Sequence, residues 1–197
     1  MPLAPKIPIH MSVAEFLDWD SPPPQQWQLV DGVPLAMAPA SGTHAAIQAE
    51  LARLIANHLA ERNMPCRVLV NPGIVPHVQS HSNFRIPDLG VTCAPILADD
   101  MTITDPILLI EILSPSNQAE TWANVWTYTT IPSVKEVLIV KTASVRADLL
   151  RRNRDGTWPQ DPQDITAGDL VFESINFILP LISIYRTTKF SSSPIAP

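Results

Sequence analysis

The stretch PILLIEILSP, residues 106–115, places one glutamate, Glu111, inside an otherwise apolar run. The run is rich in leucine and isoleucine, which indicates a buried strand over Ile107–Leu113. If Glu111 faced solvent at a sheet edge, Leu109 and Leu113 would share that face, because side chains alternate along a strand. A carboxylate within a buried strand is costly unless it is paired or binds a cation. The pattern therefore favours a functional role for Glu111 over an exposed position.

A second carboxylate comes from the segment RIPDLGV, residues 85–91. Asp88 lies at the start of a predicted strand over Leu89–Cys93. Pro-Asp alone is a common turn pair, so the functional interpretation of Asp88 depends on the presence of Glu111. Two adjacent strands would bring both carboxylates together. Two oxygen ligands with open positions suit Mg²⁺, which keeps several waters and binds phosphate oxygens.

Capping, turn and periodicity signals indicate the other elements. Ser12 and Glu15 form a capping box for a short helix, and Asp31-Gly32 marks a hairpin within WQLVDGVPLAMA. A longer helix begins at Ser41 and runs to about Asn63. Further elements are predicted as follows: strands at Cys66–Val70, Ile74–Val78, Val137–Val140 and Val145–Leu150, a helix over Asn117–Tyr128, and a strand or short helix at LPLISIY, residues 179–185.

This order is neither a regular alternation of strands and helices nor an all-β pattern. It indicates an α/β or α+β fold, with a sheet that has a helix on each face or helices grouped on one side. The length of 197 residues suits one domain over residues 1–190, followed by a flexible tail over residues 191–197.

Composition excludes several classes of protein. A hydrophobic fraction of 46% excludes wholesale disorder, and no apolar run approaches the roughly 20 residues of a membrane span. Cys66 and Cys93 make neither a disulfide framework nor a zinc site, so a reduced, cytoplasmic protein is expected.

The net charge of −6 argues against a general polyanion-coating protein, although a local basic patch would still allow nucleic acid to bind. The low charged fraction of 16% favours a homodimer or larger assembly.

Six segments resemble, in order, the Uma-type family of putative restriction endonucleases, a branch of the PD-(D/E)XK nuclease superfamily. They are EFLDW, WQLVDG, MAPASGTH, RIPDLGV, ILLIEILSPS and YTTIPSV. The resemblance implies a restriction-endonuclease-like mixed central sheet flanked by helices, and a metal-dependent endonuclease that hydrolyses DNA. It also implies that Asp88 and Glu111 bind Mg²⁺ or Mn²⁺ together with the backbone carbonyl of Ile112.

The chain departs from the family pattern at its lysine. The superfamily usually has a lysine two residues after the glutamate, where this chain has Leu113. Uma-type proteins commonly supply this lysine from the following helix, at the position that Asn124 has in this chain. Glu120 matches an acidic position of the family. Gln28 stands where the family commonly has a glutamate before the hairpin turn. Asn124 could orient a water but carries no charge, so weak or absent activity is expected. The alternative is an inactive nuclease-fold protein that serves as a DNA-binding or interaction module.

Lys135 and Lys141 match neither lysine position, and the sequence favours ordinary surface lysines for both. His44 follows Ser41 by one helical turn; the resemblance places it near the catalytic site, and a packed helix-start histidine is an equal alternative.

Two surface clusters also have two interpretations each. Trp122 and Trp126 are expected on one helix face. They could form a stacking platform for bases, but the favoured interpretation is a surface that packs against the sheet or a second subunit. Arg151, Arg152 and Arg154 form a basic cluster that could contact phosphates. The favoured interpretation is a hairpin end exposed to solvent.

Overall fold

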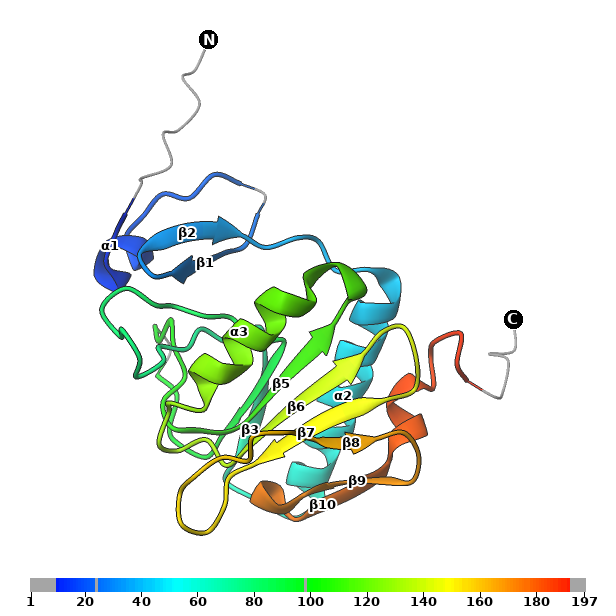
Figure 1. The fold of residues 1–197 in the computed structure, drawn as a ribbon. Coiled ribbons are helices and arrows are strands. Elements are labelled where there is room, and N and C mark those ends of the chain that lie inside the picture. The colour runs from blue at the N-terminus through cyan, green and yellow to red at the C-terminus, as the bar shows by residue number, and fades with distance from the viewer. Residues whose placement is uncertain (1–9, 24, 98, 192–197) are drawn as a thin grey trace.

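The computed structural model describes residues 10–23, 25–97 and 99–191. At its centre is a six-stranded sheet with the order β3-β4-β5-β6-β7-β8 (Figure 1). Its strands are β3 (Arg67–Val70), β4 (Leu89–Thr92), β5 (Pro106–Leu113), β6 (Glu136–Lys141), β7 (Ala147–Arg151) and β8 (Gln163–Ile165). β5 and β6 are parallel and the other neighbours are antiparallel, which confirms the expected mixed central sheet.

Two helices cover opposite faces of this sheet: α2 (Gly42–Glu61) and α3 (Gln118–Tyr128) (Figure 1). Alternate residues of β5 divide between the two faces, as the pleat requires. Leu108, Ile110 and Ile112 join the apolar core that contains α2. Leu109 and Leu113 join a second core with α3. Glu111 therefore points toward the α3 face.

The N-terminal part forms a separate small unit that packs beside the sheet. It consists of α1 (Val13–Leu17), β1 (Trp27–Val30) and β2 (Val33–Ala36). The predicted capping box at Ser12 is present, and Asp31 and Gly32 both have positive φ, as a type I′ hairpin turn requires. Leu29 exchanges backbone hydrogen bonds with Phe84, so the hairpin is fixed to the segment that leads into Asp88.

The C-terminal part adds a second hairpin against the core that contains α2. Its elements are β9 (Asp169–Phe172), the 3₁₀ helix η2 (Glu173–Ile175), β10 (Phe177–Pro180) and the 3₁₀ helix η3 (Leu181–Tyr185); a further 3₁₀ helix, η1 (Pro115–Asn117), precedes α3. The LPLISIY stretch thus supplies both the end of a strand and a short helix. Ser191 alone of the expected flexible tail lies among the described residues.

Two expectations are wrong. Residues 74–78 form no strand, because only Ile74 bridges to Arg85 and Pro76 lacks the N–H that a ladder needs. Cys66 and Cys93 form a disulfide rather than remaining reduced. They flank Arg67 and Thr92, which are paired across β3 and β4, so the strand register itself brings the two cysteines together. In the described part of the chain, no helix is both long enough and apolar enough to cross a membrane.

Candidate metal centre

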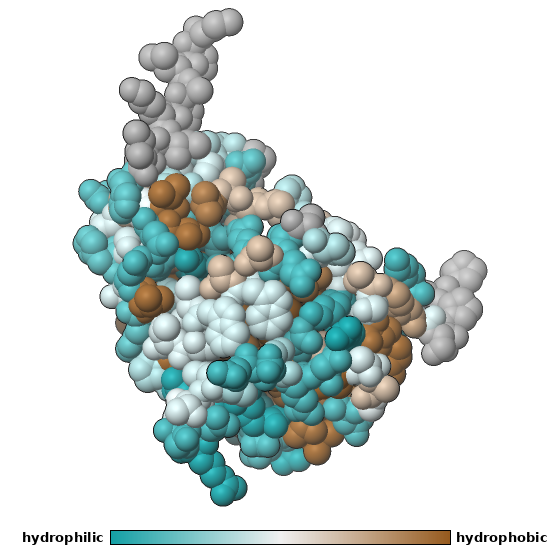
Figure 2. Space-filling view, viewed as in Figure 1, coloured by the Kyte–Doolittle hydropathy of each residue, from teal (hydrophilic) through white to brown (hydrophobic). Residues whose placement is uncertain are grey.

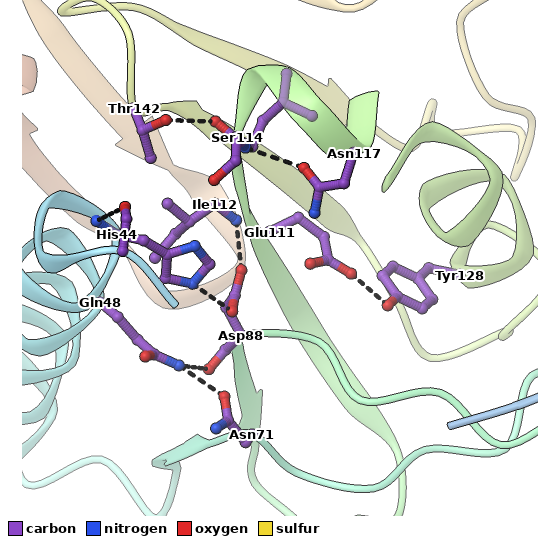
Figure 3. Close-up of polar contacts among 12 residues, drawn as sticks. His44, Gln48, Asn71, Asp88, Glu111, Ile112, Ser114, Asn117, Tyr128 and Thr142 are labelled. Atoms are coloured by element: carbon purple, nitrogen blue, oxygen red, sulfur yellow. Dashed lines mark hydrogen bonds and ion pairs between the residues drawn. The ribbon is translucent and has the colours of Figure 1, made fainter. Parts of the chain in front are cut away.

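Asp88 and Glu111 line one cavity, where β4 begins and the antiparallel β5 ends. Leu89 pairs with Ile110 in the antiparallel register, so the residue before one strand comes level with the carboxyl end of the other. The Asp88 Oδ2 atom accepts a hydrogen bond of 2.6 Å from the main-chain N–H of Ile112 (Figure 3). Two acidic side chains, from residues 23 positions apart, thus share one volume.

The Glu111 carboxylate is 7% exposed and has one strong donor. Tyr128, in the last turn of α3, donates its hydroxyl proton to Glu111 Oε1 at 2.5 Å (Figure 3). Burial raises the pKa of Glu111 well above its ordinary value, and the negative charge of Asp88 raises it further. The Tyr128 bond opposes this shift. Burial likewise raises the pKa of the Tyr128 hydroxyl, which therefore stays a donor.

Asp88 is held by several groups around it (Figure 3). His44 Nε2 lies 2.8 Å from Oδ1, and the backbone carbonyl accepts bonds from Gln48 Nε2 at 2.9 Å and from the Asn71 N–H at 3.0 Å. Gln48 also donates to Asn71 Oδ1 at 2.7 Å. The aspartate is thus fixed from α2 and from the end of β3, as well as from β5.

His44 fits both of its interpretations. Its N–H donates to the side chain of Ser41, the N-cap of α2, at 3.2 Å, as a helix-start residue would. Its ring nevertheless lies in the cavity against Asp88. The helix start therefore positions the imidazole beside the carboxylate.

The first half of α3 and Gln28 of β1 supply another wall of the cavity, which includes the acidic side chain of Glu120. Gln28 of β1 donates to Glu120 Oε1 at 2.8 Å, and Asn124 lies 3.5 Å from Gln28 Oε1. Asn124 is 8% exposed and lines the cavity, so it lies near the two carboxylates as the family register implied. Leu113 is buried in the core with α3.

The cavity has a volume of about 580 Å³. The end of β2 and the segment that follows it contribute an apolar wall of Ala36, Met37 and Pro39. This wall depends on the bonds between β1 and residue 84, which sequence reasoning did not anticipate. The N-terminal unit is therefore part of the site.

Sequence reasoning also missed Tyr128, Gln48 and Asn71. Tyr128 served only to set the register of Asn124, although the two are four residues apart and must share a helix face. Gln48 follows His44 at the same spacing. Asn71 carries no such signal, because its place depends on the pairing of β3 with β4.

The donor set suits a hard cation. Within a strand, the N–H and C=O of one residue point to the same side, so the Ile112 carbonyl faces the side of Asp88. Two carboxylates and one carbonyl leave open positions for waters, which is the coordination Mg²⁺ prefers. Among the described residues, no group of three or more His, Cys, Asp or Glu side chains forms a complete cage. The residues therefore fit Mg²⁺ or Mn²⁺ better than zinc, which favours closed nitrogen and sulfur sites.

The prediction for one of the two lysines needs correction. Lys141 is not an ordinary surface lysine: its side chain is 19% exposed, it forms an ion pair with Asp148, and it lies over the Trp122 ring. Lys135 is exposed, as expected. Trp122 and Trp126 share a face, with ring centroids 6.3 Å apart, and Trp126 is 42% exposed.

The basic cluster is only partly a solvated hairpin end. Arg151 pairs with Glu136, and Arg152 packs over the Trp158 ring and donates to main-chain carbonyls. Arg154 is exposed, as predicted.

Comparison with known proteins identifies the family of this chain. A curated relative, the uncharacterized protein slr1290 of Synechocystis sp. (strain ATCC 27184 / PCC 6803 / Kazusa), is 31% identical over 150 residues, which cover 75% of this chain and 77% of the relative. The crystal structure of a putative nuclease belonging to DUF820 from Anabaena variabilis ATCC 29413 superposes with a TM-score of 0.72 at 16% identity, covering 89% of this chain and 97% of that chain. Residues 13–177 match the Uma2 family, described as putative restriction endonuclease. The chain belongs to the Uma2 family.

Proposed function

We propose that this protein is a metal-dependent nuclease whose cation is held by Asp88, Glu111 and the Ile112 carbonyl. Family and fold are those of a restriction-endonuclease-like nuclease. The observation that carries the proposal is that Asp88, just before β4, and Glu111, on the adjacent β5, share one cavity, and each is ordered by its own hydrogen-bond donor. Such a pair is costly to bury unless a cation compensates both charges.

The reaction adds water across one phosphodiester bond. The water oxygen bonds to phosphorus, the ester P–O bond breaks, and the leaving alkoxide takes up a proton. When bound, Mg²⁺ or Mn²⁺ lowers the pKa of water and offsets the charge of the phosphate.

The protein's own groups position the reactants. Tyr128 occupies one oxygen of Glu111, which leaves the other for the cation. His44, whose Nε2 lies 2.8 Å from Asp88 Oδ1, orients that carboxylate. The Asn124 amide is placed to orient the attacking water, in the role of a catalytic residue.

One observation favours a second function, that of an inactive binding module. Among the cavity-lining residues that the structure describes, none is Lys or Arg. Asn124 stands where a relative would carry a charge, and a neutral amide stabilises a developing negative charge less well. The metal would then bind while turnover stays slow.

The two functions are separated by incubating circular DNA, both single-stranded and supercoiled duplex, with Mg²⁺ or Mn²⁺. We expect cation-dependent nicking that is lost in Asp88→Ala. The matched control is Asp164→Ala, because Asp164 is exposed and pairs with Arg146 on β7–β8, outside the cavity. Nicking that persists in Asp88→Ala would overturn the proposal. Metal binding without nicking would assign the binding module instead.

A further inference from the structure

The cavity wall is dominated by carboxamides rather than by cations. Seven of the lining residues are Asn or Gln: Gln25, Gln26, Gln28, Gln48, Asn71, Asn117 and Asn124. The same cavity is also lined by apolar groups of Met37, Pro39 and Ile86. An apolar wall facing a few hydrogen-bonding groups is typical of a site for one small, flat, polar unit.

The positive charges of the described chain lie elsewhere or are already paired. At the end of the sheet that bears Asp88, Lys141 pairs with Asp148 and Arg146 pairs with Asp164. Arg85 is buried, donates to the Leu29 carbonyl and does not line the cavity, although its charge acts on Tyr128 and Glu120.

The remaining basic cluster is at the opposite end of the sheet. Arg151 pairs across β7 and β6 with Glu136, and Glu136 pairs with Leu108 near the start of β5. Glu111 lies near the other end of β5. The strand pairing therefore keeps Arg151 and its neighbour Arg152 away from the cavity.

This distribution of charge does not suit duplex DNA. Affinity for a duplex comes largely from Lys and Arg that neutralise several phosphates. A site without such residues has to take its affinity from the bases. In a duplex, the Watson–Crick edges of the bases are already hydrogen-bonded, whereas an unpaired base exposes them.

Carboxamides are suited to read an exposed base edge. Each Asn or Gln carries a donor and an acceptor side by side, and can form two hydrogen bonds to one base. Gln25 and Gln26 are exposed at the cavity and make no side-chain hydrogen bond to any other residue that the structure describes. Asn124 has only its long contact of 3.5 Å with Gln28. These amides are free to bind a base that lies against the apolar wall.

We propose that the cavity admits an unpaired nucleotide, so that the substrate class is single-stranded nucleic acid rather than duplex DNA. This inference rests on the proposed nuclease function. The carboxamides and the apolar wall hold the base, and the adjacent phosphodiester lies at Asp88 and Glu111. DNA and RNA strands share the recognised base edges.

The test compares a short mixed-sequence strand with the same strand in a duplex. Binding is measured by fluorescence anisotropy with Mg²⁺ present, and cleavage is measured with Mn²⁺. We expect the single strand to bind at least about tenfold more tightly, which is the value of one good carboxamide–base contact. Between 50 and 200 mM salt, its affinity should fall by less than the roughly 10³-fold or more of a protein that makes many phosphate contacts. An RNA arm decides which strand is preferred.

The variant Gln26→Ala should weaken single-strand binding by roughly 2- to 10-fold, the effect of one lost hydrogen bond. Gln160→Ala, at an exposed position between β7 and β8, is the matched control and should change nothing. Equal or tighter binding of the duplex, or no effect of Gln26→Ala, would overturn the inference. Rapid cleavage of the duplex would also overturn the inference of a single-stranded substrate, but it would support the proposed nuclease function. Preferred single-strand binding without any cleavage would support the inference and overturn the nuclease function.

Discussion

Tyr128 Oη lies 2.5 Å from Glu111 Oε1, and both side chains are buried. The bond joins the last turn of α3 to β5 across the core between them. It gives the buried carboxylate a donor on one oxygen and leaves the other oxygen for the cavity. The orientation of the proposed metal ligand therefore depends on a helix residue that lies 17 positions further along the chain.

Tyr128→Phe should weaken Mn²⁺ binding several-fold and destabilise the fold by roughly 1–3 kcal/mol, because it leaves a buried carboxylate without its donor. Calorimetry and urea unfolding measure the two effects. Tyr185→Phe is the matched control, since Tyr185 is also buried but donates to the Lys141 carbonyl, outside the cavity. It should lose stability and keep its Mn²⁺ affinity. Equal loss of Mn²⁺ affinity in both variants would show that Tyr128 has only a structural role.

Asn124→Lys should raise nicking activity by a factor of roughly 10²–10³, the effect commonly seen for one preorganised group at a reacting centre. Asn124 lines the cavity, so a lysine there can approach the phosphate. Leu113→Lys tests the other superfamily geometry. Because Leu113 packs in the core with α3, that variant should be destabilised and gain less. If wild type already nicks as fast as a lysine-bearing relative, the missing lysine is not the defect inferred here.

Glu50 should make the stability depend on pH in the acid range. Its carboxylate accepts from Arg53 and Arg186, and these bonds lower its pKa to about 2. A lowered pKa stabilises the fold above the unfolded value of about 4.3, and this contribution is lost as the pH falls toward 2.

Glu50→Gln should therefore lower Tm at pH 7 by roughly 2–4 °C, if the pair contributes about 1 kcal/mol, and should differ little from wild type near pH 2. Glu61→Gln, at an exposed position of the same helix, should match wild type throughout. The test compares the Tm of Glu50→Gln and wild type at pH 7 and near pH 2. The same Tm difference at both pH values would contradict the role given to Glu50.

The protein should form a homodimer or a larger assembly. Trp126 is exposed on α3, and Val33 and Leu35 are exposed on β2; Figure 2 shows apolar side chains gathered near this hairpin. Such apolar surface on a chain with few charges is commonly covered by a partner. Light scattering at micromolar concentration should give about twice the chain mass of 21.7 kDa, or more. A mass equal to that of one chain would show a monomer.

The parts of the fold that depend on local signals could be predicted from the sequence. The capping box at Ser12, the Asp31-Gly32 turn and the apolar run of β5 all appear where expected. The strand predicted at residues 74–78 was wrong, because its apolar residues pack in loops and only Ile74 finds a strand-like partner. Periodicity cannot show whether such a partner exists.

The site follows the same division. Asp88, Glu111, His44 and Asn124 were predicted and line one cavity. Tyr128, the wall after β2 and the disulfide between Cys66 and Cys93 were not, because each depends on pairing between distant segments. A family pattern marks positions, but it does not show which side chain meets which.

The most direct test of the metal centre is calorimetric titration of Mn²⁺ into wild type, Asp88→Ala, Glu111→Gln and the control Asp164→Ala. We predict one site per chain in wild type and in Asp164→Ala, and strongly weakened binding in the other two variants. Glu111→Gln should also raise the stability measured without metal, because it removes the repulsion between the two carboxylates and keeps the shape of the side chain. Unchanged Mn²⁺ affinity in Glu111→Gln would contradict the assignment of Glu111 as a ligand and, with it, the proposed metal centre.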